Sequence, residues 1–516
     1  MAAARPAEPD SGHIEQARLP AFPPPAYAGR LVRAAAVLTL PIALDRSGAA
    51  GLQEQIAESL RGALTVGTLL PGARLPSTRE LTASLHVSRT TVAFAVQKLV
   101  DEGLLVARER SGVFVAPSER QLSPLARAGA TSALRLSSRG EDLASEALLF
   151  SSRRPRAFRL SRPALELFPI REWNRLLAKH ASRITLSQLD YEAEVPELQA
   201  AVAALVSSTR GARIEPGQVL LFSGSQRALQ FAATCLLAPG DRAWMEDPGY
   251  PGARQALRAS GARVVSRPLD GEGISLTGGG ARRPRLIYVT PSNQFPLGGA
   301  MSLARRRELL AFADGSDACI VEDDYDVEFS TAGAELPSLA ALDGAGRVLH
   351  VGSFSRTTVP ALRIGYLVAP IGVAPALRAA RTALEDPLPS LIQRTLAEFI
   401  ASGQFVRHVR RMRKEYAARR QALVEAVGRS RILRLRGPPS GLHAVVDLPP
   451  VIDDVRASEA AAVLGIEAVP LSRFCASVRL PPALVLGTGT VRPQDMADAV
   501  RTLAEAVAQC RPSRRR

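Results

Sequence analysis

The chain has 516 residues, of which 46% are hydrophobic, and a formal net charge of +16. This length exceeds one ordinary hydrophobic core, so two or three domains are expected. The charge is unusual for a cytosolic enzyme and favours a polyanionic partner such as DNA, although Arg supplies nearly all of it, as in proteins from GC-rich genomes.

The cysteines and the hydropathy pattern exclude several classes of protein. The four cysteines are widely separated and show no CxxC spacing, so they fit neither a zinc site nor a secreted disulfide framework: Cys235, Cys319, Cys475 and Cys510. No stretch approaches the roughly 18 apolar residues of a membrane helix. Glu8 and Asp10 are also inconsistent with a signal peptide. We therefore expect a soluble cytoplasmic protein without a membrane partner or a metal.

The composition along the chain predicts five segments. Residues 1–40 are rich in Ala and Pro and are expected to be disordered. Residues 41–117 form a compact unit of helices and a hairpin, and residues 118–157 are expected to be a linker. Strands and helices alternate over residues 158–510, which indicates an α/β domain, and residues 511–516 are a short basic tail.

The first unit has the pattern of a helix-turn-helix. Leucine and isoleucine recur every four residues from Leu52 to Leu64, which predicts an amphipathic helix. Ser77 and Glu80 form a capping box that starts a short helix ending near Leu85. After a three-residue turn, Ser88 caps a second helix over residues 89–101, whose exposed first turn carries Arg89, Thr90 and Thr91. In a helix-turn-helix, such a turn enters the major groove.

A hairpin follows these helices. Apolar segments 103–106 and 113–115 flank the stretch Arg108 to Gly112, which places Arg110 at the tip of a wing near the DNA backbone or minor groove. The stretch "PGARLPSTRELTASLHVSRTTVAFAVQKLVDEGLLVARERSGVFVA" resembles the GntR-type winged helix almost from end to end. The resemblance implies DNA contacts by Arg74, Ser77, Arg79, Ser88, Arg89, Thr90, Thr91 and Gly112, to which the wing adds Arg110.

Four blocks of the α/β region resemble fold-type I aminotransferases in the version fused to GntR domains, the MocR family. They are "LFSGSQ" at 221–226, "EDPGYPG" at 246–252 followed by "YVTPSNQFPLGGAMSLARRRELL" at 288–310, "IVEDDYDVEF" at 320–329, and "GSFSRTTVPALRIGY" at 352–366. The implied fold is a small α+β winged helix-turn-helix followed by a large α/β domain of the pyridoxal-phosphate (PLP) dependent transferase type. The resemblance also implies a homodimer that binds double-stranded operator DNA.

The resemblance assigns a cofactor site to this domain. It implies that Ser223, Gly224, Ser225 and Arg363 bind the phosphate, since a turn at a helix start presents N–H groups and hydroxyls to anions. Asp323 would face the pyridine nitrogen, and Tyr325 would hydrogen-bond the ring oxygen. A metal site is the competing interpretation of this acidic run, but no His accompanies the acids.

Arg356 departs from the family pattern. The family has Ser-Lys-Thr in the fourth block, where Lys binds the cofactor covalently, and this chain has Ser355-Arg356-Thr357. A guanidinium stays protonated and does not form imines. The late strand 483–487 also lacks an Arg for a substrate carboxylate. The sequence thus predicts a regulator without catalytic residues or lysine-aldimine catalysis.

The sequence leaves the role of the pocket open. PLP, pyridoxamine phosphate or another anion could still bind noncovalently through Ser223, Ser225, Arg363, Asp323, Tyr325 and Arg356, or the domain could be an empty dimerisation scaffold. Further alternatives are an aminotransferase that retains activity, a ligand-independent repressor and a nonspecific nucleic-acid binder. The sequence names neither the operator nor the effector.

Overall fold

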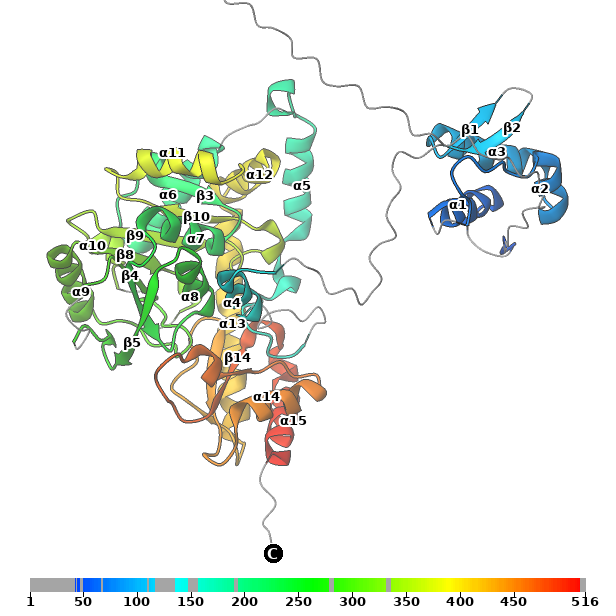
Figure 1. Ribbon diagram of the computed structural model, residues 1–516. Coiled ribbons are helices and arrows are strands. Elements are labelled where there is room, and N and C mark those ends of the chain that lie inside the picture. Colours follow the sequence, from blue (N-terminus) through cyan, green and yellow to red (C-terminus); the bar gives the residue numbers. More distant parts are fainter. Residues whose placement is uncertain are drawn as a thin grey trace, which may run out of the picture. The chain divides into compact units, whose positions relative to one another are not determined.

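The computed structural model describes most of the chain (Figure 1), namely residues 42, 44–46, 50–65, 68–108, 111–116, 135–146, 156–189, 194–277, 283–330 and 336–510. Among the sequence-based predictions, segments 1–40 and 511–516 and the wing residue Arg110 lie outside these residues. The chain divides into two compact units, residues 1–135 and 136–516. Within the described part, no helix is long and apolar enough to cross a membrane.

The smaller unit contains three helices and an antiparallel hairpin: α1 (Leu52–Thr65), α2 (Thr78–Leu85), α3 (Arg89–Asp101), β1 (Leu105–Arg108) and β2 (Gly112–Val115). The four-residue spacing in α1 places Ile56 and Leu60 on one face, where both are fully buried. They share a core with Val92 and Leu99 of α3 and with Leu105 of the hairpin. The predicted winged helix-turn-helix is confirmed.

Helix α4 (Ser138–Glu146) lies within residues 118–157, where the sequence predicted a linker without regular structure. It contacts α8 and so belongs to the larger unit. At the end of this stretch, Ala157 forms a bridge with Ile466. Within residues 118–157, α4 and Ala157 therefore pack against the larger domain.

The larger unit is built on an eight-stranded mixed sheet with the order β3-β10-β9-β8-β7-β4-β5-β6. Its strands are β3 (Val219–Phe222), β4 (Arg242–Asp247), β5 (Arg263–Asp270), β6 (Gly273–Ile274), β7 (Leu286–Val289), β8 (Cys319–Asp323), β9 (Val348–Ser353) and β10 (Gly365–Val368). Strands β5, β4, β7, β8 and β9 are parallel, whereas β10 is antiparallel to both of its neighbours. Strands β3, β7 and β10 are continuous apolar runs, and every residue in them is buried.

Helices cover both faces of this sheet (Figure 1). Along β3, Val219 and Leu221 pack in one core with α5, α6 and α12, whereas Leu220 and Phe222 pack in another with α7, α8 and α11. The helices are α5 (Ile170–Ala181), α6 (Pro196–Arg210), α7 (Ser225–Leu236), α8 (Pro251–Ala259), α9 (Leu303–Ser316), α10 (Leu339–Leu342), α11 (Ala374–Leu384) and α12 (Ser390–Ala401).

A C-terminal lobe adjoins the large sheet through the long helix α13 (Gln404–Gly428). The lobe has a four-stranded antiparallel sheet and two helices: β11 (Arg434–Leu435), β12 (His443–Asp447), α14 (Asp454–Val463), β13 (Val469–Pro470), β14 (Ala483–Gly487) and α15 (Met496–Gln509). The first half of α13 packs with the large sheet, and Leu423 and Val427 in its second half pack with the lobe. The predicted fold class, a winged helix-turn-helix followed by a large α/β transferase-like domain, is confirmed.

Candidate nucleic-acid interface and ligand site

The start of α3 presents a polar surface. The Ser88 hydroxyl accepts a hydrogen bond from the Thr91 amide at 3.1 Å, which caps the helix as predicted. The same hydroxyl lies 2.7 Å from each of the hydroxyls of Thr90 and Thr91. Arg89 and Thr90 are exposed and Thr91 is half-buried. The first turn of α3 is thus fixed by its cap, with hydrogen-bonding groups facing outward.

The residues around α2 extend this surface. Ser77 and Glu80 form the predicted capping box, since the Ser77 hydroxyl accepts from the Glu80 amide at 3.2 Å and the Glu80 carboxylate accepts from the Ser77 amide at 2.6 Å. Arg79 and Arg74 are exposed. Gly112 has φ +104°, and a Cβ there would lie 3.1 Å from the Nε of Arg74. A glycine at this position therefore lets the Arg74 side chain lie against the hairpin.

The basic groups of the smaller unit differ in how they are neutralised. Arg61 pairs with Glu58 and Glu102, and Lys98 pairs with Glu54 at 2.7 Å. Within the described residues, Arg74, Arg79 and Arg89 form no ion pair: their charges remain available to phosphates. The unpaired arginines lie beside the starts of α2 and α3.

Sequence reasoning did not select Phe94, which is 57% exposed. It lies one turn beyond Thr90 on the exposed side of α3, where Ala93 and Gln97 are also exposed. A phenylalanine in this position is suited to apolar contact with a thymine methyl group. The sequence contained a signal for this residue, because Phe94 follows Thr90 by one helical turn in a helix whose start at Ser88 was predicted.

The second candidate site lies at the carboxyl ends of the parallel strands. Residues that immediately follow β3, β4, β7, β8 and β9 meet at this edge, because those strands run in the same direction. β10 runs in the opposite direction, so the residues before Gly365 reach the same edge. The four blocks that resemble aminotransferases are brought together in this way.

One side of this site is suited to an anion. Helix α7 starts at Ser225 without a side-chain cap, and Gly224 before it has φ +103°. The hydroxyls of Ser223 and Ser225 and the guanidinium of Arg363 make no hydrogen bond within the described part of the chain, and the Arg363 Cζ lies 4.0 Å from where a Cβ of Gly224 would be. Free N–H groups at a helix start with hydroxyls and a cation nearby can hold a phosphate.

Gly365 allows the two halves of the anion side to approach. A Cβ at this position would lie 2.6 Å from both the carbonyl carbon of Gly224 and the amide nitrogen of Ser225. β10 therefore packs directly against the turn between β3 and α7. The sequence motif contained this glycine, but its spatial role appears only in the folded sheet.

The other side contains the residues predicted to hold a ring. Asp323 ends β8, is 6% exposed, and accepts a hydrogen bond from the Tyr288 hydroxyl at 2.7 Å. Burial raises the pKa of Asp323 to about 6, although the Tyr288 hydrogen bond and the charge of Arg356 oppose the increase. The Tyr325 hydroxyl is buried and has no hydrogen-bond partner among the described residues. Burial likewise raises the pKa of Tyr250 to about 12.

Arg356 lies between these groups. Its Nη1 donates to Asp326 Oδ2 at 2.6 Å and its Nη2 donates to the Ser161 hydroxyl at 3.1 Å. The guanidinium carbon lies 4.6 Å from the centre of the Tyr325 ring, a cation–π contact. Opposite charges around it raise the pKa of Arg356, despite the cost of burial. The side chain is therefore a fixed cation.

The acidic run after β8 does not converge on one point. Glu322 accepts hydrogen bonds from the amides at the start of α10, and Asp324 pairs with Arg210 at 2.5 Å. Arg210 also pairs with Glu328, while Asp323 and Asp326 face Tyr288 and Arg356 respectively. Among the described residues, no group of three His, Cys, Asp or Glu side chains is arranged to hold a metal.

The structure also places residues here that sequence reasoning had not assigned to the site. Asn293, Asp326 and His443 are at most 2% exposed and each has a buried polar atom without a partner among the described residues. Asn293 and Asp326 lie inside motifs that the resemblance already covered, whereas His443 begins β12 in the C-terminal lobe. No local sequence signal links His443 to this edge.

The anion side and the ring side together fit a phosphorylated pyridine. The cradle at Gly224 and Gly365 would be filled by added side chains, and the Tyr325 hydroxyl lacks a partner that a ligand oxygen would supply. The lysines do not contribute: Lys179 pairs with Glu398 at 2.6 Å and Lys414 is exposed on α13. The third lysine, Lys98, belongs to the smaller unit.

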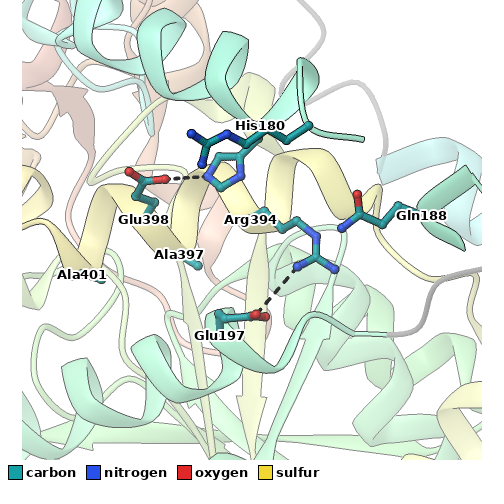
Figure 2. A pocket seen from close by; sticks show the side chains of 8 residues that line it. His180, Gln188, Glu197, Arg394, Ala397, Glu398 and Ala401 are labelled. Carbon is teal, nitrogen blue, oxygen red and sulfur yellow. Dashed lines mark ion pairs between the residues drawn. The ribbon is translucent and has the colours of Figure 1, made fainter. Parts of the chain in front are cut away.

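A different pocket, of about 390 Å³, lies between α5, α6 and α12 (Figure 2). Two ion pairs lie in the pocket, with His180 2.8 Å from Glu398 and Arg394 3.7 Å from Glu197. None of the predicted cofactor residues lines it. We assign no ligand to this pocket.

Comparisons with known proteins match both units. Residues 52–115 match the model of the GntR family of bacterial regulatory proteins, and residues 168–480 match that of class I and II aminotransferases. The chain is 35% identical over 473 residues to the probable rhizopine catabolism regulatory protein MocR of Rhizobium meliloti, covering 90% of this chain and 95% of the relative. It is 38% identical over 396 residues to the HTH-type transcriptional regulator TauR of Rhodobacter capsulatus, covering 74% of this chain and 81% of that protein.

Among solved structures, the chain resembles the alpha-aminoadipate aminotransferase LysN of Thermus thermophilus, which was crystallised with N-(5'-phosphopyridoxyl)-L-leucine. The TM-score is 0.62 at 29% identity, and the match covers 72% of this chain and 95% of LysN. The larger unit thus has the fold of this enzyme.

Proposed function

Since this chain belongs to the MocR-type family of transcriptional regulators, which join a GntR winged helix to an aminotransferase-like domain, we propose that it regulates transcription in response to a noncovalently held ligand. The winged helix is the DNA-binding part of the molecule. The ligand lies at the carboxyl edge of the large sheet and is PLP or a related phosphorylated anion. The protein acts without aminotransferase catalysis.

The observation that carries this proposal is the environment of Arg356. By the sequence resemblance, Arg356 takes the place of the family's cofactor-binding lysine, and it is held by Asp326, Ser161 and the Tyr325 ring. A guanidinium cannot replace an amine as nucleophile or proton carrier. Covalent attachment is therefore lost, while the charges that attract an anion are retained.

The remaining residues hold the ligand from two sides. Ser223, Ser225 and Arg363 bind the phosphate, since the two hydroxyls and the guanidinium have no hydrogen-bond partner within the described residues. Gly224, whose amide donates to the Phe222 carbonyl at 2.7 Å, lets the phosphate approach the backbone of the turn. Asp323 pairs with the ring nitrogen and Tyr325 donates to the ring oxygen. When bound, such a ring can act as an electron sink, but in this protein Arg356 leaves it without the amine that its chemistry needs.

The DNA contacts involve the exposed groups of the smaller unit. Arg74, Arg79 and Arg89 bind phosphates, and Ser77, Ser88, Thr90 and Thr91 position α3 in the major groove, with the hairpin at Gly112 and Arg110 as the wing. A homodimer reads two half-sites. Ligand binding regulates transcription by favouring one arrangement of the DNA-binding units.

The test is a titration of the full-length protein with PLP, followed by visible absorption and by borohydride reduction with mass spectrometry. Wild type is expected to bind without a lysine-linked absorption band, and Arg356→Lys is expected to gain that band and a reducible adduct at position 356. Arg307→Lys, which adds a lysine at an exposed position of α9, is the matched control and should behave like wild type.

Each alternative has its own outcome. A reducible adduct on wild type, or turnover of an amino donor, would show that the protein is an aminotransferase and would overturn the proposal. Absence of binding by both wild type and Arg356→Lys would favour a purely structural effector domain and a ligand-independent regulator.

A further inference from the structure

A cluster of buried polar atoms without partners lies beside Arg356. Within the described residues, hydrogen-bond partners are lacking for both terminal atoms of the Asn293 amide, for Asp326 Oδ1 and for His443 Nδ1. These three residues, the polar cluster, are 1%, 2% and 2% exposed respectively. Buried polar groups are nearly always satisfied by protein, water or ligand, so this cluster is suited to a bound polar group.

The members of the cluster come from separate parts of the chain, and Asn293 and Asp326 meet at Gly441, two residues before His443. A Cβ on Gly441 would lie 2.8 Å from Asn293 Nδ2 and 3.1 Å from Asp326 Oδ2. The His443 ring lies 6.2 Å from the Tyr325 ring, over which Arg356 is stacked. The cluster is therefore continuous with the ligand site.

His443 is neutral and carries its proton on Nε2, which makes its other ring nitrogen an acceptor. Its Nε2 lies 3.0 Å from the Pro296 carbonyl oxygen, so Nε2 carries the proton and donates to it. Burial, together with the charge of Arg356, lowers the pKa of His443 to about 3. The ring is neutral and its Nδ1 is a hydrogen-bond acceptor.

The other members also supply acceptors. Asp326 Oδ2 already accepts from Arg356 and from the Leu442 amide, which leaves Oδ1 as an acceptor. The Asn293 amide contributes one acceptor and one donor group. The cluster thus presents three acceptors, of which one is a carboxylate oxygen. A water molecule has two hydrogens to donate, whereas a protonated primary amine has three, one for each acceptor of the cluster.

We propose that Asn293, Asp326 and His443 form a subsite for a protonated primary amine of the ligand. The inference rests on the proposed function, since the amine belongs to the molecule whose phosphate and ring the rest of the site holds. Asp326 contacts Arg356, so a ring substituent that reaches Arg356 also reaches the cluster. Among the phosphorylated pyridines that the proposed function allows, the site accordingly favours the amine-bearing one over its alcohol or aldehyde counterpart.

The experiment compares two probes by calorimetry with the full-length protein, pyridoxamine 5'-phosphate and pyridoxine 5'-phosphate. They differ only in one group, an amine or a hydroxyl, and neither forms an imine with a lysine. Wild type is expected to bind the amine about tenfold more tightly, the ratio that corresponds to one charge-assisted hydrogen bond. In Asp326→Asn and in Asn293→Leu, the ratio should fall toward one.

Asp386→Asn makes the same chemical change at an exposed residue and should keep the wild-type ratio. Circular dichroism establishes that each variant is folded, and Asn293→Leu provides a second test if Asp326→Asn does not fold. Equal binding of both probes by wild type, as expected for a cluster that holds only water, overturns the inference while the proposed function stands. A ratio that persists in both cluster variants also overturns it. If neither probe binds, the proposed ligand site itself is wrong.

Discussion

At the scale of single residues, burial of the Asp323 carboxyl in the ligand site lowers the stability of the folded protein at neutral pH. Its carboxyl is nearly inaccessible to water, and its hydrogen-bond partner within the described residues is the Tyr288 hydroxyl, so burial raises its pKa to about 6. Glu246, which accepts from Thr290, is buried in the same region and its pKa is raised to about 7. Both groups take up protons more readily in the folded state than in the unfolded state.

The sign of this effect gives a prediction. A carboxyl with a raised folded-state pKa favours folding below its unfolded pKa and loses that advantage as the pH rises through its folded pKa. Removing the charge by Asp323→Asn should therefore stabilise the ligand-free protein at pH 7 by about 3 kcal/mol, because two pKa units correspond to about that free energy. Denaturant unfolding at pH 4 and pH 7 measures the difference, which should be present only at the higher pH.

The same substitution should weaken the binding of PLP, since an amide cannot neutralise a protonated ring nitrogen. Asp386→Asn, which is exposed, is the control for both measurements. An Asp323→Asn variant that is less stable than wild type at pH 7 would contradict the assignment of a strained buried carboxyl.

At the scale of secondary-structure elements, close packing positions the anion side of the site. The turn between β3 and α7 lies directly against the start of β10, which requires Gly365. The uncapped start of α7 is thereby held at the carboxyl edge of the sheet. The start of α3 is fixed in a different way, because the Ser88 side chain caps the turn that carries Arg89 and Thr90.

Gly365→Ala tests the role of this packing. The new Cβ would lie 2.6 Å from the backbone of Gly224 and Ser225, and overpacking of this kind costs about 1–3 kcal/mol. We expect a lower urea midpoint and a loss of phosphate-ligand binding, because the turn must move. Gly372→Ala, at a glycine where a Cβ meets nothing within 4 Å, should leave ligand binding unchanged. Unchanged binding by Gly365→Ala would show that this turn does not hold the phosphate.

At the scale of the whole molecule, a DNA-binding unit is joined to a unit with the fold of a PLP enzyme. The excess positive charge of the chain is consistent with DNA binding. In the smaller unit, Arg74, Arg79 and Arg89 form no ion pair with a described residue, so their charges are available to DNA phosphates. Because such contacts release counterions, the affinity for DNA should depend strongly on salt.

Salt titration of operator binding gives the corresponding prediction. For the full-length protein, the logarithm of the binding constant should fall linearly with the logarithm of the salt concentration. Arg89→Ala should weaken binding and reduce the slope by about one, the change expected for one phosphate contact. Arg307→Ala, at an exposed position of the larger unit, is the control. An unchanged slope in Arg89→Ala would show that this residue does not contact a phosphate.

The sequence by itself determined the two-part organisation and the local elements. Caps at Ser77 and Ser88, the four-residue apolar spacing of α1, and the order of the motif blocks depend on interactions between near neighbours, so they are visible in the chain. The inference that Arg356 stands where the family has lysine rests on a local motif of the same kind and stays a prediction. Helix α4 was missed, because its stability depends on packing against α8, more than 100 residues later.

Only the tertiary structure decided which side chains meet. His443 comes from a lobe that follows the last motif block, and at the start of β12 its ring packs near the rings of Phe295 and Tyr325. The partnerless atoms of Asn293 and Asp326 likewise depend on burial, which no local pattern encodes. Proximity between distant segments is set by packing of the whole chain, and for this reason the polar cluster could not be inferred before the fold was known.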